Sequence, residues 1–158
     1  KPAESEIKER NVAAPPHLAK EFAKSFIQGS EIYSREGHCI TCHQGNGKGL
    51  PGSGFPPLAG TNWVTGHPDR LIKLTLKGLM GPIEVMGVKY PGQVPMTPFE
   101  HMLKDDEISA VLTYVRNSFG NKASPVTIDQ VAKIRNNYLD KLGLYSPEQL
   151  LKEHPLEK

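Results

Sequence analysis

The stretch Cys39-Ile40-Thr41-Cys42-His43 decides the interpretation of this sequence. Its two cysteines are the only cysteines of the 158-residue chain, and a histidine directly follows the second one. Because two residues separate the thiols, both sulfur atoms can reach the same side of one bound group. The first question is therefore which group this short motif holds.

Cys-x-x-Cys-His is the sequence pattern of c-type haem attachment. Two thiols add to the two vinyl groups of one haem and form two thioether bonds, and the adjacent histidine supplies an imidazole ligand to the iron. The motif therefore predicts one covalently attached haem c, with its iron, held by Cys39, Cys42 and His43.

Three other uses of these residues stay open at the level of sequence. A thioredoxin-like dithiol has the same cysteine spacing but lies near a βαβ pattern, which is missing here. A zinc site formed by Cys39, Cys42, His43 and His38 would lack the second, distant ligand pair of zinc ribbons. A disulfide would close a short and strained loop. Haem attachment fits the residues best.

The stretch after the motif favours a bulky bound group independently. Residues 44–98 hold eleven of the 15 glycines and eight of the 14 prolines of the chain. So many turn formers exclude long helices and a regular sheet, and apolar runs such as Ile83–Val88 are weak strand signals. Long loops stay ordered only when they pack around something.

Helical periodicity appears on both sides of these loops and once within them. One helix is expected from about residue 18 to about 35, and a short one from Pro68 to the stop signal at Gly78. The clearest helix covers 105–119, with Asp105 or Asp106 as its cap. Two capping boxes, Thr127-x-x-Gln130 and Ser146-x-x-Gln149, predict further helices near 127–140 and 147–153.

The iron needs a sixth ligand or an open position. Met96 is the best candidate, because Pro95 and Pro98 restrict the backbone around it and a rigid loop lowers the entropy cost of holding a weak thioether ligand. The other candidates are three methionines and three histidines: Met80, Met86, Met102, His38, His67 and His101.

Composition and charge exclude several classes of function. The 19 basic and 17 acidic residues give a net charge of +2, which is too little for a protein that binds nucleic acid nonspecifically. No apolar run is long enough for a transmembrane helix. The sequence opens without a leader segment, which we expect to have been removed or to lie outside an excised domain.

Residues 21–120 resemble a class I cytochrome c domain. The matching features follow in order: Gly29 and Tyr33 of the first helix, the motif at 39–43, Phe55-Pro56-Pro57-Leu58-Ala59-Gly60, Tyr90-Pro91-Gly92-Gln93-Val94-Pro95-Met96, and the closing helix with Tyr114. The resemblance implies an all-α fold of helices and loops wrapped around one covalent haem. It divides the chain into an N-terminal arm or linker (1–17), the cytochrome domain (18–120) and a helical C-terminal extension (121–158).

The resemblance also assigns roles to single residues. The Pro56 carbonyl, rather than that of Pro57, is expected to accept a hydrogen bond from His43, and Leu58 is expected to pack on the haem. Gly29 is expected to allow the terminal helices to cross beside Tyr114. Trp63 and Tyr90 are either donors to the haem propionates or ordinary packing residues. Four lysines either form a ring around the haem edge or are ordinary solvated side chains: Lys48, Lys73, Lys77 and Lys89.

The function implied is transfer of single electrons between redox partners, not enzymatic catalysis. The alternative is a haem enzyme or gas-binding sensor with an open sixth position. The sequence of the extension resembles cytochrome domains that accompany or are fused to periplasmic oxidoreductases, so a dehydrogenase, reductase or oxidase is the expected partner, and the extension is a candidate docking element. Haem attachment of this kind places the protein in the periplasm or on the extracytoplasmic face of a membrane. The oligomeric state is left open.

Overall fold

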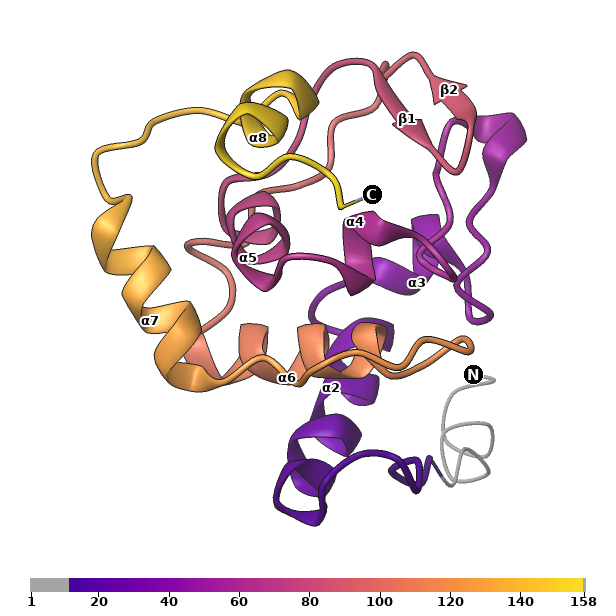
Figure 1. Ribbon diagram of the computed structural model, residues 1–158, viewed down its shortest axis with the longest axis vertical. Coiled ribbons are helices and arrows are strands. Elements are labelled where there is room, and N and C mark those ends of the chain that lie inside the picture. Colours follow the sequence, from indigo (N-terminus) through magenta and orange to yellow (C-terminus); the bar gives the residue numbers. More distant parts are fainter. Residues whose placement is uncertain (1–11, 158) are drawn as a thin grey trace.

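The computed structural model describes residues 12–157, so most of the expected N-terminal arm, residues 1–11, lies outside the described residues. Helices and loops make up most of the molecule and a small hairpin lies at one edge of it, as Figure 1 shows, which confirms the predicted helical fold. In chain order the elements are η1 (Lys20–Phe22), α2 (Ala23–Ser34), α3 (Cys39–His43), η2 (Pro51–Ser53), α4 (Asn62–Thr65), α5 (Pro68–Lys77), β1 (Ile83–Val85), β2 (Val88–Tyr90), α6 (Asp105–Arg116), α7 (Ile128–Asn137) and α8 (Pro147–Glu153).

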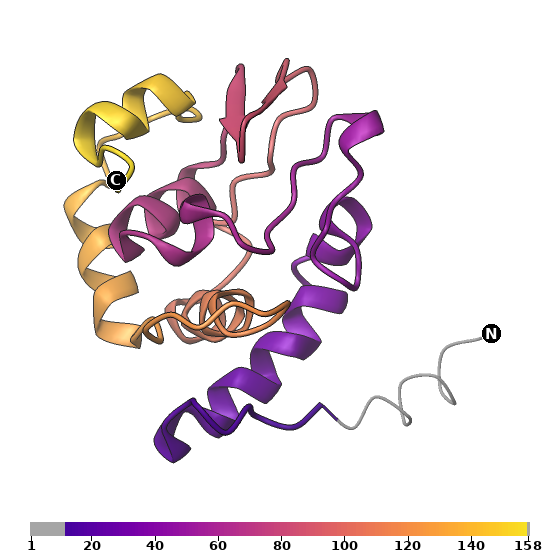
Figure 2. The same ribbon diagram turned by 45° about the vertical axis from the view of Figure 1, so that its right-hand side comes forward.

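The first and the closing helix of the predicted domain, α2 and α6, cross in close contact (Figure 2). Gly29 makes this approach possible, because an added Cβ would overlap the Ala110 carbonyl and lie 2.8 Å from the Cβ of Tyr114. The Tyr114 ring packs against Phe26 and Tyr33, with centroids 5.1 and 5.4 Å apart. The expected crossing at Gly29 beside Tyr114 is therefore present.

Helix α5 has the expected bounds, and α6 begins at the expected residue, but its capping residue and its C-terminal end differ from the prediction. The N-cap of α6 is Lys104, whose N–H donates to the Glu107 carboxylate at 2.9 Å. Asp105 is instead the first helical residue, and its carboxylate forms an ion pair with Arg135 of α7 at 2.6 Å. The helix ends at Arg116, because Asn121 and Ala123 donate to the carbonyls that would continue it.

The hairpin of β1 and β2 was not predicted. Its strands pair antiparallel, with Ile83 opposite Tyr90, and have three residues each. Met86 and Gly87 form the turn, both with positive φ (52° and 80°), as a two-residue hairpin turn with the correct twist requires. Methionine is unusual at such a position, so the sequence lacked the usual signal.

The C-terminal extension shares the core of the molecule. Both capping boxes are present, at Thr127–Gln130 and at Ser146–Gln149, and they begin α7 and α8 as predicted. Val126, Val131 and Ile134 belong to the same buried cluster as the inner face of α6. In Figure 1, α7 lies beside α5 and α6, and α8 lies near the hairpin.

Within residues 12–157, none of the helices combines the length and the apolarity needed to cross a membrane.

Candidate functional site

The core encloses a cavity of about 470 Å³, which is within the usual size range of ligand pockets. Its lining comes from α3, the loop at 54–58, α4, α5, the hairpin, the loop at 92–97 and α6, and most of these side chains are apolar. Both cysteines, His43 and Met96 contribute to this lining. The structure thus brings together the residues that the motif and the two prolines singled out.

The two cysteines lie on the single turn of α3 and face the same cavity. Both are free thiols. Burial raises the pKa of the Cys39 thiol to about 12, so this thiol is protonated at neutral pH, unlike the reactive thiolate of a redox dithiol. Within the described residues no three His, Cys, Asp or Glu side chains are grouped as a metal ion would require, so the zinc and dithiol alternatives gain no support.

His43 ends α3 and is oriented by a backbone carbonyl. Its Nδ1 lies 2.9 Å from the carbonyl oxygen of Pro56. A carbonyl only accepts hydrogen bonds, so Nδ1 carries the proton and donates it, which leaves the Nε2 lone pair available. Burial lowers the pKa of His43, although the bond to Pro56 opposes this shift, and the ring is therefore neutral at pH 7. A neutral imidazole with a free Nε2 is a metal ligand.

Gly49 allows the chain to approach Pro56, and the sequence analysis missed this role. It has a φ of +66°, and an added Cβ would lie 2.6 Å from the Pro56 carbonyl oxygen that His43 uses. The Gly49 N–H donates to the His43 carbonyl at 3.0 Å. The excess of glycine after the motif was the available signal, but it did not distinguish this glycine from its neighbours.

Met96 is the methionine that lines the cavity. Its backbone pairs with Leu79 through two hydrogen bonds, Met96 N–H to Leu79 O at 2.8 Å and Leu79 N–H to Met96 O at 3.2 Å. The other three methionines are 55% to 63% exposed and are not part of the lining. Of the histidine candidates only His38 borders the cavity, and it is the N-cap of α3, the helix that ends with His43.

Leu58, Trp63 and Tyr90 all line the cavity, as the resemblance implied. The single indole N–H of Trp63, however, donates to the Glu84 carbonyl at 3.1 Å. The neighbouring hairpin thus supplies an acceptor for this N–H, and the role of Trp63 as a propionate donor stays a prediction. Both side chains are buried, Trp63 with 6% and Tyr90 with 3% exposure, which is compatible with either role.

Two of the four lysines proposed for a charged ring are buried in ion pairs. Lys73 contacts Glu153 of α8 at 3.2 Å, and Lys77 contacts Glu100 at 2.8 Å. They are only 4% and 5% exposed, so the ring of four lysines is wrong. Lys48 and Lys89 are exposed. The carboxylates that pair with Lys73 and Lys77 belong to residues that are distant from them in the sequence.

The donor set fits a covalently bound haem. Two thiols on one helical turn, a neutral imidazole with a free Nε2 and a thioether from a separate loop line a largely apolar cavity. The two thiols would form the thioether bonds to a haem, and the imidazole and the methionine sulfur would be ligands of its iron. No other arrangement weighed from the sequence uses all four residues.

Comparison with known proteins gives a consistent result. The sequence model of the family described as "Cytochrome c" matches residues 26–119. Cytochrome c-552 of Thermus thermophilus is 40% identical over 134 residues, which cover 79% of this chain and 92% of that protein. The cytochrome c subunit of the quinone alcohol dehydrogenase of Gluconacetobacter polyoxogenes is 33% identical over 112 residues, 70% of this chain but 23% of that subunit. The fructose dehydrogenase cytochrome subunit of Gluconobacter japonicus is 32% identical over 109 residues, 68% of this chain and 22% of that subunit.

Proposed function

This chain belongs to the cytochrome c family, and from this premise we propose that it transfers single electrons between redox proteins through one haem iron ligated by His43 and Met96. Membership of the family implies one covalently attached haem c with its iron, and an electron carrier rather than an enzyme. The assignment of His43 and Met96 as the iron ligands rests on one observation. A neutral, oriented imidazole and one methionine line the same cavity.

Each residue of the site has a separate task in this proposal. Cys39 and Cys42 provide the two sulfur atoms for thioether bonds. Pro56 fixes the ring orientation and tautomer of His43 through the 2.9 Å hydrogen bond, which also raises the basicity of the ligand nitrogen. The pairing of Met96 with Leu79 holds the thioether loop, so little entropy is lost when the sulfur binds. Leu58 and the other apolar lining residues exclude water from the site.

A bound haem iron supplies reversible one-electron exchange between its ferric and ferrous states. Methionine as a ligand favours the ferrous state relative to a second histidine, and so does an apolar lining. Tyr90 is the candidate propionate donor that the structure leaves at the cavity wall, whereas Trp63 would first have to release the Glu84 carbonyl.

The partners and the location belong to the same proposal. Two of the relatives are by name cytochrome subunits of alcohol and fructose dehydrogenases, which supports a dehydrogenase, reductase or oxidase as the redox partner. The chemistry of thioether attachment supports the periplasm or the extracytoplasmic face of a membrane.

A spectrally followed redox titration of the holoprotein tests the proposed ligands. We expect a single one-electron transition and a sulfur-to-ferric charge-transfer band in the red, which Met96→Ala should abolish. Met102→Ala is the matched control, because Met102 is 55% exposed and lies outside the cavity lining, and it should keep the band. A high-spin spectrum with ready binding of carbon monoxide would instead favour the alternative of an open sixth position.

A further inference from the structure

Two buried arginines hold the short helix α4 from the side away from the cavity. Arg70 is 0% exposed and Arg116 is 2% exposed. Arg70 Nη2 donates to the Asn62 carbonyl at 2.8 Å, and Arg116 Nη1 donates to the carbonyls of Val64 and Gly66 at 2.7 and 2.8 Å. Trp63 and Val64 of α4 form part of the cavity wall. The two guanidinium groups therefore bind the backbone of the same segment that lines the cavity.

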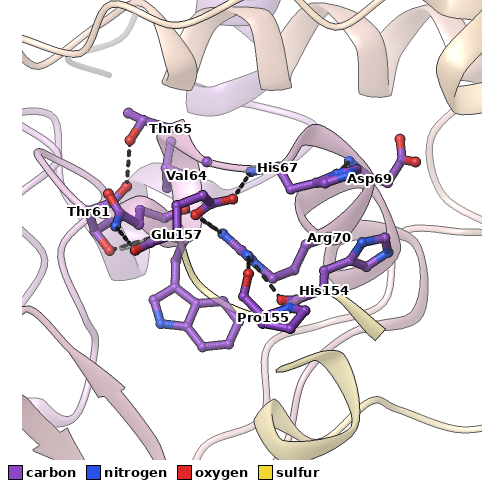
Figure 3. A network of polar contacts seen from close by, with 12 residues as sticks. Thr61, Val64, Thr65, His67, Asp69, Arg70, His154, Pro155 and Glu157 are labelled. Carbon is purple, nitrogen blue, oxygen red and sulfur yellow. Dashed lines mark hydrogen bonds and ion pairs between the residues drawn. The ribbon is translucent and has the colours of Figure 1, made fainter. Parts of the chain in front are cut away.

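The Arg70 guanidinium also binds the C-terminal segment of the chain, as Figure 3 shows. Its Nη1 donates to the carbonyls of His154 and Pro155 at 3.0 and 3.2 Å, and its Nη2 contacts the Glu157 carboxylate at 3.2 Å. The other carboxylate oxygen of Glu157 accepts the His67 N–H at 2.8 Å. This segment therefore packs over Arg70, with both carboxylate oxygens of Glu157 engaged.

The surroundings are shaped for this contact. Gly66 has no side chain, and an added Cβ would lie 2.6 Å from Arg70 Nη2 and 2.6 Å from the Asn62 carbonyl oxygen. The Arg70 guanidinium carbon also lies 5.4 Å from the centre of the Trp63 ring, the same ring that lines the cavity. The positive charges are thus separated from the cavity by α4 and its indole.

The two arginines carry two positive charges, and Glu157 offsets one of them. Across residues 12–157, the carboxylate of Glu157 is the one acid in ion-pair contact with either arginine. Burial lowers the pKa of Arg116, the Glu157 charge opposes that shift, and the Arg70 charge adds to it. Burial alone would raise the pKa of Glu157, but hydrogen bonds from its own backbone, from Arg70 and from His67 lower it, so the carboxylate is ionised at neutral pH.

We propose that Glu157 tunes the reduction potential of the haem from outside the cavity, by offsetting one of the two positive arginine charges behind α4. This inference rests on the proposed function, because it requires an iron in the cavity. Ferric iron carries one more positive charge than ferrous iron. A local excess of positive charge therefore disfavours the ferric state and raises the potential, and in a water-poor interior the effect is screened only weakly.

Glu157→Gln tests the role of the charge, because glutamine keeps the size of the side chain and an accepting oxygen. Glu148→Gln is the matched control: it removes the same formal charge from α8, where the carboxylate is 80% exposed and lies 3.6 Å from Lys152. Glu157→Asp restores the charge. The side chain of Glu157 is 44% exposed, so glutamine and aspartate fit at this position without overpacking the core.

Spectroelectrochemical titration of the four holoproteins is the measurement. We expect a higher potential for Glu157→Gln than for the wild type, a value indistinguishable from the wild type for Glu148→Gln, and a return toward the wild type for Glu157→Asp. The inference is overturned if Glu157→Gln shifts the potential no more than Glu148→Gln. It is also overturned if Glu157→Gln loses the methionine–iron band, because the charge and not the coordination is proposed to change. A wild type without that band would contradict the proposed function instead.

Discussion

Gly49 illustrates how much a single backbone position can matter to the site. Its φ of +66° is one that L side chains rarely adopt, and its Cα faces the carbonyls of Phe55 and Pro56. The second of these carbonyls orients His43. A side chain at position 49 would therefore disturb the proposed ligand indirectly, without touching the cavity.

We predict that Gly49→Ala lowers the free energy of unfolding of the holoprotein by about 1–3 kcal/mol, the cost of a strained backbone position. Gly52→Ala is the control, because nothing lies within 4 Å of a Cβ at that position, and it should stay within about 0.5 kcal/mol of the wild type. Denaturant unfolding followed by circular dichroism measures both. Equal stability of the two variants would mean that the loop relaxes around position 49.

At this scale, local sequence signals identified residues that line the cavity. The attachment motif is a matter of spacing along a few residues, and Met96 is marked by its flanking prolines. The burial of Lys73 and Lys77 depends on Glu153 and Glu100, which are distant in the sequence. The sequence carries no local signal that separates a solvated lysine from a buried, paired one. The prediction of a ring of four lysines was therefore wrong.

At the level of elements, three extended segments lie side by side next to the site. Leu79 pairs with Met96 on one side and with Tyr145 on the other. The Tyr145 N–H donates to the Gly78 carbonyl at 3.1 Å, and its carbonyl accepts the Met80 N–H at 2.9 Å. The extension thus supports the segment that holds the proposed thioether ligand, besides any role in docking to a partner.

Tyr145→Ala should therefore affect both stability and the iron ligand. Tyr145 is 3% exposed in a cluster with Trp63, Leu74 and Leu150, and the loss of such an aromatic residue costs about 3–5 kcal/mol. We expect the red charge-transfer band to disappear at a lower temperature than in the wild type. Leu142→Ala, at a side chain that is 85% exposed, should melt like the wild type. If the band of Tyr145→Ala persists to the same temperature as in the wild type, the extension does not support the Met96 loop.

The elements themselves were predictable to different degrees. The capping boxes and the proline–glycine pair of α5 are local signals, and all three helices that they mark are present. The cap of α6 was misplaced because the Asp105 carboxylate binds Arg135 of another helix. The hairpin was missed because its strands are short and a methionine stands in its turn.

At the scale of the whole molecule, the imidazole of His154 in the C-terminal segment makes the stability of the fold depend on pH. Its Nε2 accepts a hydrogen bond from the Lys73 ammonium at 2.9 Å. Burial, followed by the charges of Lys73 and His67, lowers the pKa of His154, although Asp69 and Glu153 oppose this. In the unfolded chain the imidazole returns to its ordinary pKa of 6.5.

Stability should therefore fall as the pH drops below about 6.5, because the unfolded chain then takes up a proton that the folded chain resists. This contribution levels off once the pH is below the folded pKa. His154→Gln should give a flatter profile of unfolding free energy against pH, whereas His101→Gln, with a side chain that is 92% exposed, should follow the wild type. Parallel profiles for all three proteins would contradict the role of His154.

The mass of the purified, denatured polypeptide tests the central claim most directly, because only a covalently attached group survives denaturation. The account predicts a polypeptide that is heavier by one haem, and the bare mass after Cys39 and Cys42 are both changed to serine. The bare mass in the wild type, or the bare mass plus one zinc ion under native conditions, would contradict it.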